Sequence, residues 1–337
     1  MAGRAKLTKT RYDHFALEGD AMLQAPCADA GARSQAASSA TAHVPQQGSV
    51  SDEVWLLAAD RMMARALEVN RWVEIFATHG VCLVPKLVSE LRLWATGKGL
   101  ALRDHLGNEV TPPRLCICRV YERYAPRHLE LMGTICQPSA AMVDLCYDKA
   151  LVAQLVAGAG VPMIASEVVP DFSSELAEAG RISLPAVLKP TSGRGGAGVE
   201  LAHDDGELVY HLDGLVGSAG LVQPLVDPGH DVRVYVIGGE PRYAMERIGK
   251  PGDFRSNYST GGTARPYKLD AMLAGYARAV LAALPESLSF GSVDFCFDHG
   301  SPVFCEVNAN LGCHIPYEYG GFDLIGDYAD WLREECL

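Results

Sequence analysis

The segment Gly291–Gly312 restricts the possible folds of this chain more than any other segment. It reads GSVDFCFDHGSPVFCEVNANLG, two short apolar runs on either side of a cluster of turn-forming residues. This pattern predicts a β-hairpin. With the loop centred on Gly300, Asp294 lies directly across from Glu306, and Asn308 shares the face of Glu306 because side chains alternate along a strand. The hairpin is therefore expected to carry two carboxylates and one amide on the same face.

Carboxylates that face each other in this way indicate a metal site. Across a bare sheet they repel each other and destabilise the pairing. A hard divalent cation between them reverses the sign of the interaction, because Mg²⁺ takes carboxylate and amide oxygens as ligands. A solvated hairpin with scattered charge is the alternative, and the apolar residues that alternate with the carboxylates argue against it. We therefore predict a metal site with three ligands: Asp294, Glu306 and Asn308.

Length and charge narrow the class of protein. At 337 residues the chain is long enough for two or three domains. Its net charge of −12 argues against a nucleic-acid partner, because phosphate backbones are bound by basic surfaces. No apolar run reaches the roughly 20 residues that span a bilayer, and the N-terminal segment lacks the apolar centre of a secretory signal. We therefore expect no membrane partner. The ten cysteines include no CxxC pair, so we expect a reduced, cytoplasmic protein without a structural zinc site.

The first part of the chain predicts an open α/β sheet. Residues 1–48 are rich in Ala, Ser, Gln and Gly, which favours a disordered leader. In residues 49–145, apolar strand patterns alternate with helical ones, and this alternation is typical of a parallel sheet. The predicted strands are 54–58, 81–84 and 115–120, with helices at 64–79 and around 128–132.

Two lysines follow in positions that suit an anion. Asp148 is a good N-cap for a helix that begins at Lys149. Lys149 could point at an anion in the cleft, although a lysine at this position is more often simply solvated. A strand then ends at Lys189 and runs into the glycine-rich loop 193–198. The loop contains G-x-G-x-x-G, but a dinucleotide fold requires a helix next, and the strand-like residues 199–202 follow instead. The pattern predicts a flap between antiparallel strands, whose backbone N–H groups can cover phosphates; an ordinary flexible hairpin is the alternative.

The last part of the chain predicts a second sheet. Residues 231–237 alternate cleanly and place Asp231, Arg233 and Tyr235 on one face. A polar, glycine-rich connection at 252–262 follows, and helices are expected at 267–284 and 322–335. Arginines on such a face suit the recognition of phosphate and carboxylate groups.

Taken together, these motifs resemble the ATP-grasp superfamily. The resemblance rests on Asp148-Lys149, on Lys189 before the flap, on DVRVYVIGG and GDFRSN, and on Asp294-x₁₁-Glu306-x-Asn308. The chain is most similar to the RimK-like carboxylate–amine ligases, and the likeness covers about residues 50–337. It implies an α/β chain with the ATP-grasp fold and an N-terminal open parallel α/β domain. The implied divisions are 1–48 (leader), 49–145 (N-terminal domain), 146–222 (central subdomain with the flap) and 223–337 (C-terminal subdomain with the metal site).

The resemblance also implies how ATP is held. The phosphates would contact both lysines and the flap, the adenine would contact the main chain at the hinge, and Asp231 would meet the ribose or the hinge side of the cleft. Proline stands at 224, where the family commonly has an acidic residue, and its carbonyl is kept. The implied ATP-binding residues are Lys149, Lys189, Gly193, Arg194, Gly195, Gly196, Gln223, Pro224, Leu225, Asp231, Arg255 and Asn257.

The implied reaction is amide-bond formation through an acyl phosphate, with release of ADP and phosphate. Asp294, Glu306 and Asn308 would bind two Mg²⁺ ions, which Mn²⁺ could replace. The implied catalytic residues are Lys189, Arg233 and Arg255.

The substrates stay open at this point. We expect a small-molecule or peptide carboxylate and an amine. The run after Asn308 lacks the proline that many relatives have there, so the acceptor of those relatives cannot be assumed for this chain. Two alternatives remain: a protein or carrier-protein acceptor, and a non-catalytic nucleotide-binding regulator. A homo-oligomer is compatible with the resemblance.

Overall fold

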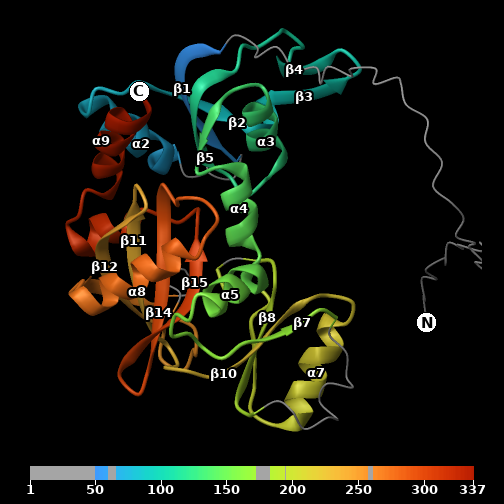
Figure 1. Cartoon of the computed structure of the whole chain (residues 1–337), viewed down its shortest axis with the longest axis vertical. Coiled ribbons are helices and arrows are strands. Elements are labelled where there is room, and N and C mark those ends of the chain that lie inside the picture. Colours follow the sequence, from blue (N-terminus) through green and yellow to red (C-terminus); the bar gives the residue numbers. More distant parts are fainter. Residues whose placement is uncertain (1–49, 60–65, 172–182, 194, 257–260) are drawn as a thin grey trace, which may run out of the picture. The chain divides into compact units, whose positions relative to one another are not determined.

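The computed structural model describes residues 50–59, 66–171, 183–193, 195–256 and 261–337. The predicted leader, residues 1–48, lies outside them. The described chain forms three larger sheets and one separate hairpin (Figure 1).

The first sheet is the predicted open parallel sheet. Its strand order is β2-β1-β5-β6, and β1 pairs in parallel with β2 and β5, as β5 does with β6. The sheet is therefore fully parallel, which confirms the prediction. Its elements are β1 (Ser51–Ala58), α2 (Ala66–Thr78), β2 (Leu83–Leu87), β5 (Pro113–Arg119), α3 (Tyr124–Leu131), β6 (Ile135–Gln137) and α4 (Ala140–Tyr147).

An additional hairpin is inserted in the chain between β2 and β5 and forms a separate two-stranded sheet. It consists of β3 (Leu91–Thr96) and β4 (Gly99–Asp104), which pair antiparallel after the short 3₁₀ turn Val88–Glu90. The sequence analysis did not predict it. Strand β3 is mostly exposed and β4 is mostly half-buried, so neither carries the continuous apolar run that marks β1 and β5 in the sequence.

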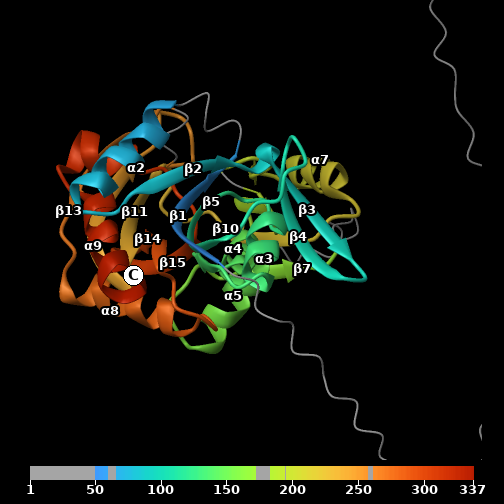
Figure 2. The ribbon, with the colours of Figure 1, turned by 90° about the horizontal axis from the view of Figure 1, so that it is seen from above.

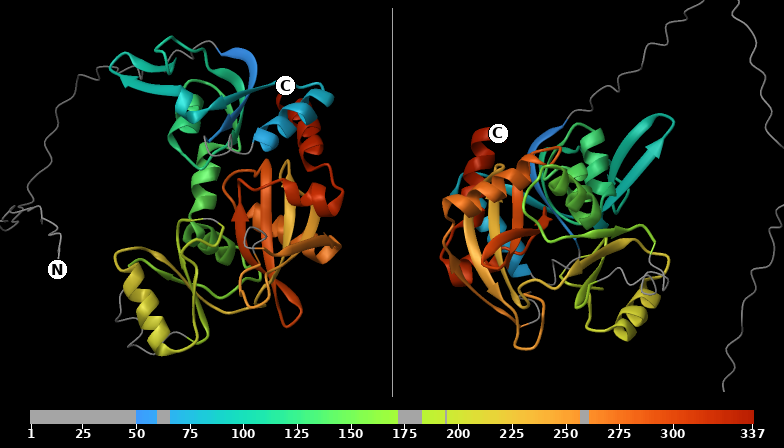
Figure 3. Two further views of the ribbon diagram at one scale, coloured as in Figure 1. Left: turned by 180° about the vertical axis from the view of Figure 1, so that it is seen from behind. Right: turned by 60° about the horizontal axis from the view of Figure 1, so that its bottom comes forward.

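The second sheet carries the glycine-rich flap. Its order is β7-β10-β8-β9, and all of its pairs are antiparallel. The predicted arrangement of strand, flap and antiparallel strand is confirmed by β8 and β9. Helix α7, which the sequence analysis did not predict, lies along this sheet (Figure 3) and is capped by Asp204, whose side chain accepts the Glu207 N–H. The elements are α5 (Lys149–Gly158), β7 (Glu167–Val169), β8 (Ala186–Pro190), β9 (Glu200–Ala202), α7 (Asp205–Leu215) and β10 (Gly220–Pro224).

The third sheet is antiparallel, in the order β13-β12-β11-β14-β15. Apolar clusters cover both of its faces. On one face, valines of β11 pack with α8. On the other face, Tyr235 packs in one cluster with α2 and α9, two helices that lie side by side (Figure 2). Trp72 of α2 and Tyr328 of α9 make an edge contact. The elements are β11 (His230–Ile237), β12 (Glu240–Ile248), β13 (Thr263–Tyr267), α8 (Ala271–Ala282), β14 (Phe290–Asp298), β15 (Ser301–Asn308), the π-helical turn Pro316–Gly320 and α9 (Leu324–Cys336).

The central hairpin, β14–β15, has the predicted pairing of Asp294 with Glu306 but a different turn. Its loop has two residues, His299 and Gly300, both with positive φ (48° and 82°), as a type I′ turn requires. A register shift between Asp294 and Phe295 then restores the pairing of Asp294 with Glu306. Cys305 is the extra residue at this bulge, because Phe304 pairs with Phe295 and Glu306 with Asp294.

None of the helices in the described ranges combines the length and the apolar character that crossing a membrane would require.

Candidate active site

A cleft brings together residues from the second and third sheets. Its volume is about 940 Å³, including the part that is open to solvent. The flap and β8 line one side, and the ends of β11, β12, β14 and β15 line the other. Among the predicted site residues, the cleft is lined by Lys149, Lys189, Gly193, Gly195, Gly196, Asp231, Arg255, Glu306 and Asn308.

Lys149 is joined to the flap. Asp148 caps α5 by accepting the Ala150 and Leu151 N–H groups, which fixes the helix start and the direction of Lys149. The Lys149 Nζ donates to the Gly193 carbonyl at 2.8 Å. Burial lowers the pKa of Lys149. The charge of Glu306 raises this pKa, and the charge of Lys189 lowers it further. An anion between the two lysines would therefore be well compensated.

The flap has a backbone that favours glycine. Gly193, Gly195 and Gly196 have φ values of 138°, 61° and 76°, a region that side chains with a Cβ rarely adopt. Arg194, which the sequence analysis placed in the same site, lies outside the described residues.

Lys189 lies at the other side of the flap base. It is near the end of β8, and its Nζ lies 3.9 Å from the Cys305 Sγ. Burial opposes its charge, but Cys305 and Glu306 outweigh burial and raise the pKa of Lys189. The ammonium group is therefore charged at neutral pH.

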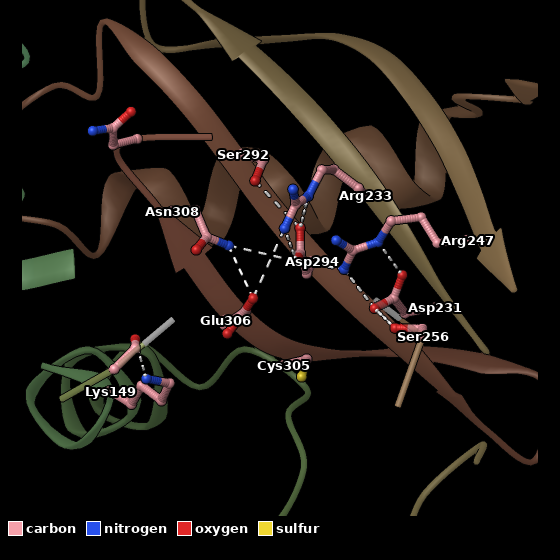
Figure 4. A network of polar contacts seen from close by, with 12 residues as sticks. Lys149, Asp231, Arg233, Arg247, Ser256, Ser292, Asp294, Cys305, Glu306 and Asn308 are labelled. Carbon is pink, nitrogen blue, oxygen red and sulfur yellow. Dashed lines mark hydrogen bonds and ion pairs between the residues drawn. The ribbon is translucent and has the colours of Figure 1, made fainter. Parts of the chain in front are cut away.

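Three oxygen-bearing side chains converge on the hairpin, and they fit a hard divalent cation. The Asn308 Nδ2 donates to the Glu306 Oε1 at 3.0 Å and to the Asp294 Oδ2 at 3.5 Å (Figure 4). Rotation of the Asn308 amide would present its oxygen to the same space. Two carboxylates and one amide oxygen form a donor set that suits Mg²⁺.

A buried network of charges lies behind these side chains. The Arg233 Nε and Nη2 donate to the two oxygens of Asp294 at 2.8 and 2.6 Å. Arg247 makes the same fork to Asp231 at 2.7 and 2.6 Å, and its Nη2 also donates to the Asp294 Oδ2 at 2.8 Å (Figure 4). The Ser256 hydroxyl donates to Asp231 as well. Each fork is of the strong, bidentate kind.

Asp294 lies within this buried network and not, as predicted, with Glu306 and Asn308 at the surface of the cleft. Its side chain is fully buried and is not part of the cleft surface, in contrast to Glu306 and Asn308. Burial opposes its ionisation, but Arg233 and Arg247 dominate and hold the pKa of Asp294 well below its usual range. Asp294 is therefore held as a carboxylate at neutral pH, and three arginine N–H groups bind it.

Arg255 is held by a neighbour on its own loop. Its Nε and Nη2 donate to the two oxygens of Asp253, both at 3.0 Å, and its side chain lines the cleft. Asn257, predicted to face the triphosphate with it, lies outside the described residues.

The predicted adenine contacts do not line the cleft. The Leu225 N–H donates to the Pro185 carbonyl at 3.1 Å, and Pro224 pairs with Ala186 at the end of β10. The Gln223 side chain is buried, and its Nε2 donates to the Ser166 hydroxyl at 2.7 Å. The Leu225 N–H is therefore already bonded within the protein.

The segment after Asn308 is anchored to the first sheet. Arg119, at the end of β5, donates to the Leu311 carbonyl, and the Tyr121 hydroxyl donates to the Asn310 carbonyl. Arg119 is buried, with its guanidinium carbon 5.0 Å from the ring centre of Trp72. The first sheet thus fixes the backbone directly beyond the hairpin.

The sequence analysis missed Arg247, which connects two acidic residues of the network. No sequence signal marked it, because Arg247 comes to lie opposite Asp231 only through the register shift between Tyr235 and Val236. It also missed His230, which hydrogen-bonds both Asp227 and Glu246 at the mouth of the same cleft.

Comparison with known proteins agrees with this architecture. A family model described as RimK-like ATP-grasp domain matches residues 146–332. A probable alpha-L-glutamate ligase of Thioalkalivibrio sulfidiphilus is 32% identical over 216 residues, which is 62% of this chain and 71% of the relative. A probable alpha-L-glutamate ligase of an Enterobacter species is 32% identical over 223 residues, 64% of this chain and 73% of the relative.

Solved structures share the fold. A RimK domain ATP-grasp protein from Sphaerobacter thermophilus matches with a TM-score of 0.63 and 23% identity, covering 83% of this chain and 98% of that one. The VanG D-Ala:D-Ser ligase from Enterococcus faecalis matches with a TM-score of 0.64 and 18% identity, covering 84% and 97%. The match of the family model to more than half of the chain, together with the cleft, shows that this protein belongs to the RimK-like ATP-grasp family of carboxylate–amine ligases.

Proposed function

We propose that this enzyme uses ATP to join the carboxylate of an amino acid or peptide to an amine, through an acyl phosphate, and releases ADP and phosphate. The observation that carries the proposal is the meeting of two lysines, a glycine-rich flap and the Glu306–Asn308 pair in one cleft. Phosphoryl transfer needs alignment and compensation of charge more than it needs an acid or a base, and these groups supply both.

The cations of the cleft would hold the polyphosphate. Lys149 and Lys189 extend toward it from α5 and from β8, on either side of the flap base. Gly193, Gly195 and Gly196 would cover the phosphates with backbone N–H groups, because the absence of Cβ atoms permits a close approach. Arg255 would add a further charge by exchanging its contact with Asp253 for a phosphate oxygen.

Magnesium would be held at the hairpin. Glu306 and Asn308 are the accessible ligands, and Asp294 lies directly behind them. Two bound Mg²⁺ ions would supply neutralisation of the phosphate charge that develops during transfer. Arg233 and Arg247 keep Asp294 ionised and fixed in direction, so we assign Arg233 a positioning role at Asp294 in place of the catalytic role that the resemblance implies.

In the first reaction step, an oxygen of the substrate carboxylate attacks the γ-phosphorus, and the bond to the bridging oxygen of ADP breaks. In the second step, the amine nitrogen attacks the acyl carbon, phosphate leaves, and the amine gives up its proton to solvent. The substrate carboxylate is the nucleophile of the first step and the amine is the nucleophile of the second, so the protein needs no nucleophile of its own.

The relatives suggest the substrate class. Those named above are probable alpha-L-glutamate ligases, and structures with the same fold include a D-cycloserine synthetase and an ATP-grasp ligase bound to a minimal precursor. We therefore propose an amino acid as the amine and an amino-acid or peptide carboxylate as its acceptor.

The test is analysis of nucleotide products. Purified protein is incubated with Mg-ATP and with pools of amino acids, dipeptides and small carboxylates. We expect ADP and phosphate only in the pools that contain a substrate pair. AMP and pyrophosphate would contradict the acyl-phosphate reaction, and ATP binding without turnover in any pool would contradict a small-molecule or peptide acceptor.

A further inference from the structure

Three cysteines that do not line the cleft meet in the first sheet. Cys116 and Cys118 are two residues apart on β5, so their side chains lie on the same face. Cys136, on the neighbouring strand β6, is the direct cross-strand partner of Cys116. The parallel pairing therefore brings three thiols together from segments about 20 residues apart in the sequence.

The distances between the sulfur atoms suit a metal ion. All three atoms lie within 4.8 Å of one another, and those of Cys116 and Cys118 are 3.9 Å apart. An ion in the plane of three sulfurs, at the usual metal–thiolate distance of about 2.3 Å, places those sulfurs about 4.0 Å apart. The thiols therefore need little movement to surround one ion.

The surroundings limit which ion can be bound. The cluster is packed against Trp55, Leu57, Ala125 and Leu129 in an apolar core, and within the described ranges no His, Asp or Glu joins the three sulfurs as a fourth close ligand. A site with sulfur ligands only and a coordination number of three selects soft ions over Mg²⁺ or Ca²⁺.

Access to the cluster is possible from the sheet edge. Strand β6 is the last strand of the first sheet and has only three residues. Cys136 is buried on it, whereas the adjacent Ile135 is exposed. A short edge strand opens locally at a low free energy, so an ion can enter without global unfolding.

We propose that Cys116, Cys118 and Cys136 form a binding site for one soft, thiophilic metal ion with three sulfur ligands, a class to which monovalent copper and Cd²⁺ belong. Each sulfur that binds as a thiolate loses its proton to solvent. The bound ion joins β6 to β5. Strand β5 ends at Arg119, which donates a hydrogen bond to the Leu311 carbonyl in the segment beyond the hairpin. The other interpretation of the cluster is three reduced cysteines that serve as small apolar side chains.

The test uses Cd²⁺ as the probe on the full-length protein, under a phosphine reductant and with excess Mg²⁺ to occupy the cleft. We expect the ultraviolet thiolate-to-cadmium absorption to saturate at one equivalent, with a rise in the midpoint of thermal unfolding. Cys118→Ala and Cys136→Ala should each lose both effects. Cys313→Ala, which removes a single buried thiol outside the cluster, is the matched control and should keep them.

A second measurement covers the case in which a variant does not fold. Wild-type protein is treated with a thiol alkylating reagent with and without Cd²⁺, and the modified cysteines are identified by mass spectrometry. Joint protection of Cys116, Cys118 and Cys136 supports the site. The proposal is overturned by protection of Cys296 and Cys305 alone, by binding that persists in both variants, or by no binding. It is also overturned if the three cysteines are protected only without reductant, because that result would indicate a disulfide.

Discussion

The buried network at Asp294 makes a quantitative prediction for Arg247→Met. Methionine keeps much of the length of the side chain but removes both hydrogen bonds to Asp231 and the one to Asp294. Arg247 and Asp231 are both 5% exposed. In the variant the Asp231 carboxylate is therefore buried, and among the described residues the Ser256 hydroxyl is its one remaining side-chain hydrogen-bond partner. Removing one member of such a pair costs about 3–5 kcal/mol of the free energy of unfolding.

The assay is urea unfolding followed by tryptophan fluorescence. With a slope of about 3 kcal/mol per molar urea, the loss corresponds to a midpoint that is lower by about 1–1.7 M. The matched control is Arg278→Met, because Arg278 and Glu240 form an ion pair in which both side chains are more than half exposed. Such a pair contributes about 0–1 kcal/mol, so its midpoint should change little.

A double variant separates the charge from the packing. Replacing both partners, in Asp231→Leu with Arg247→Met, removes the unpaired carboxylate and should recover part of the lost stability. The reasoning is refuted if Arg247→Met unfolds at the same urea concentration as Arg278→Met. It is also refuted if the double variant loses as much stability, relative to the wild type, as the two single substitutions lose in sum.

Three further predictions concern the cleft. Glu306→Gln should abolish ADP formation while the unfolding midpoint stays near that of the wild type, since Glu306 is one-third exposed; retained turnover would contradict its role at the metal. Lys149→Met should raise the KM for ATP by tenfold or more, about 1.4 kcal/mol of lost binding, and steady-state kinetics with unchanged KM would exclude its contact with phosphate. Burial opposes the charge of His230, but hydrogen bonds to Asp227 and Glu246 raise its pKa. Protonated His230 therefore stabilises the fold fully below about pH 6.5, and this stabilisation is lost as the pH rises through the raised pKa. The stability difference between wild type and His230→Gln should therefore shrink between pH 5.5 and 8.5 in urea titrations, and a difference independent of pH would contradict the assignment.

Local patterns in the sequence were sufficient to predict the parallel sheet, the flap and the pairing of Asp294 with Glu306. The pairing was predicted from a loop centred on Gly300, whereas the structure has a two-residue turn and a bulge at Cys305. The two differences compensate. A strand pattern does not reveal a bulge, because the bulge depends on the neighbouring strand.

A similar bulge hid Arg247. Counting outward from the Gly238–Gly239 turn without interruption would place residue 246 across from Asp231. A register shift between Tyr235 and Val236 places Arg247 there instead. A single extra residue exchanges the inward and outward faces of a strand, so sequence reasoning could not identify this partner.

The cysteine cluster was beyond prediction for a different reason. The pair Cys116 and Cys118 was visible in the sequence, but the third thiol comes from β6, after a helix. Only the pairing of Cys116 with Cys136 brings it into place. Contacts between strands that are separated by a crossover depend on the tertiary fold and leave no local signal.

The most direct measurement of the central claim follows a labelled oxygen. The carboxylate substrate found in the product screen is prepared with ¹⁸O in its carboxyl group and incubated with the enzyme, Mg-ATP and the amine. An acyl phosphate transfers one of these oxygens to phosphorus, so we predict one ¹⁸O atom in the released phosphate for each amide formed. Label in AMP, or phosphate that contains none, would contradict the proposed reaction.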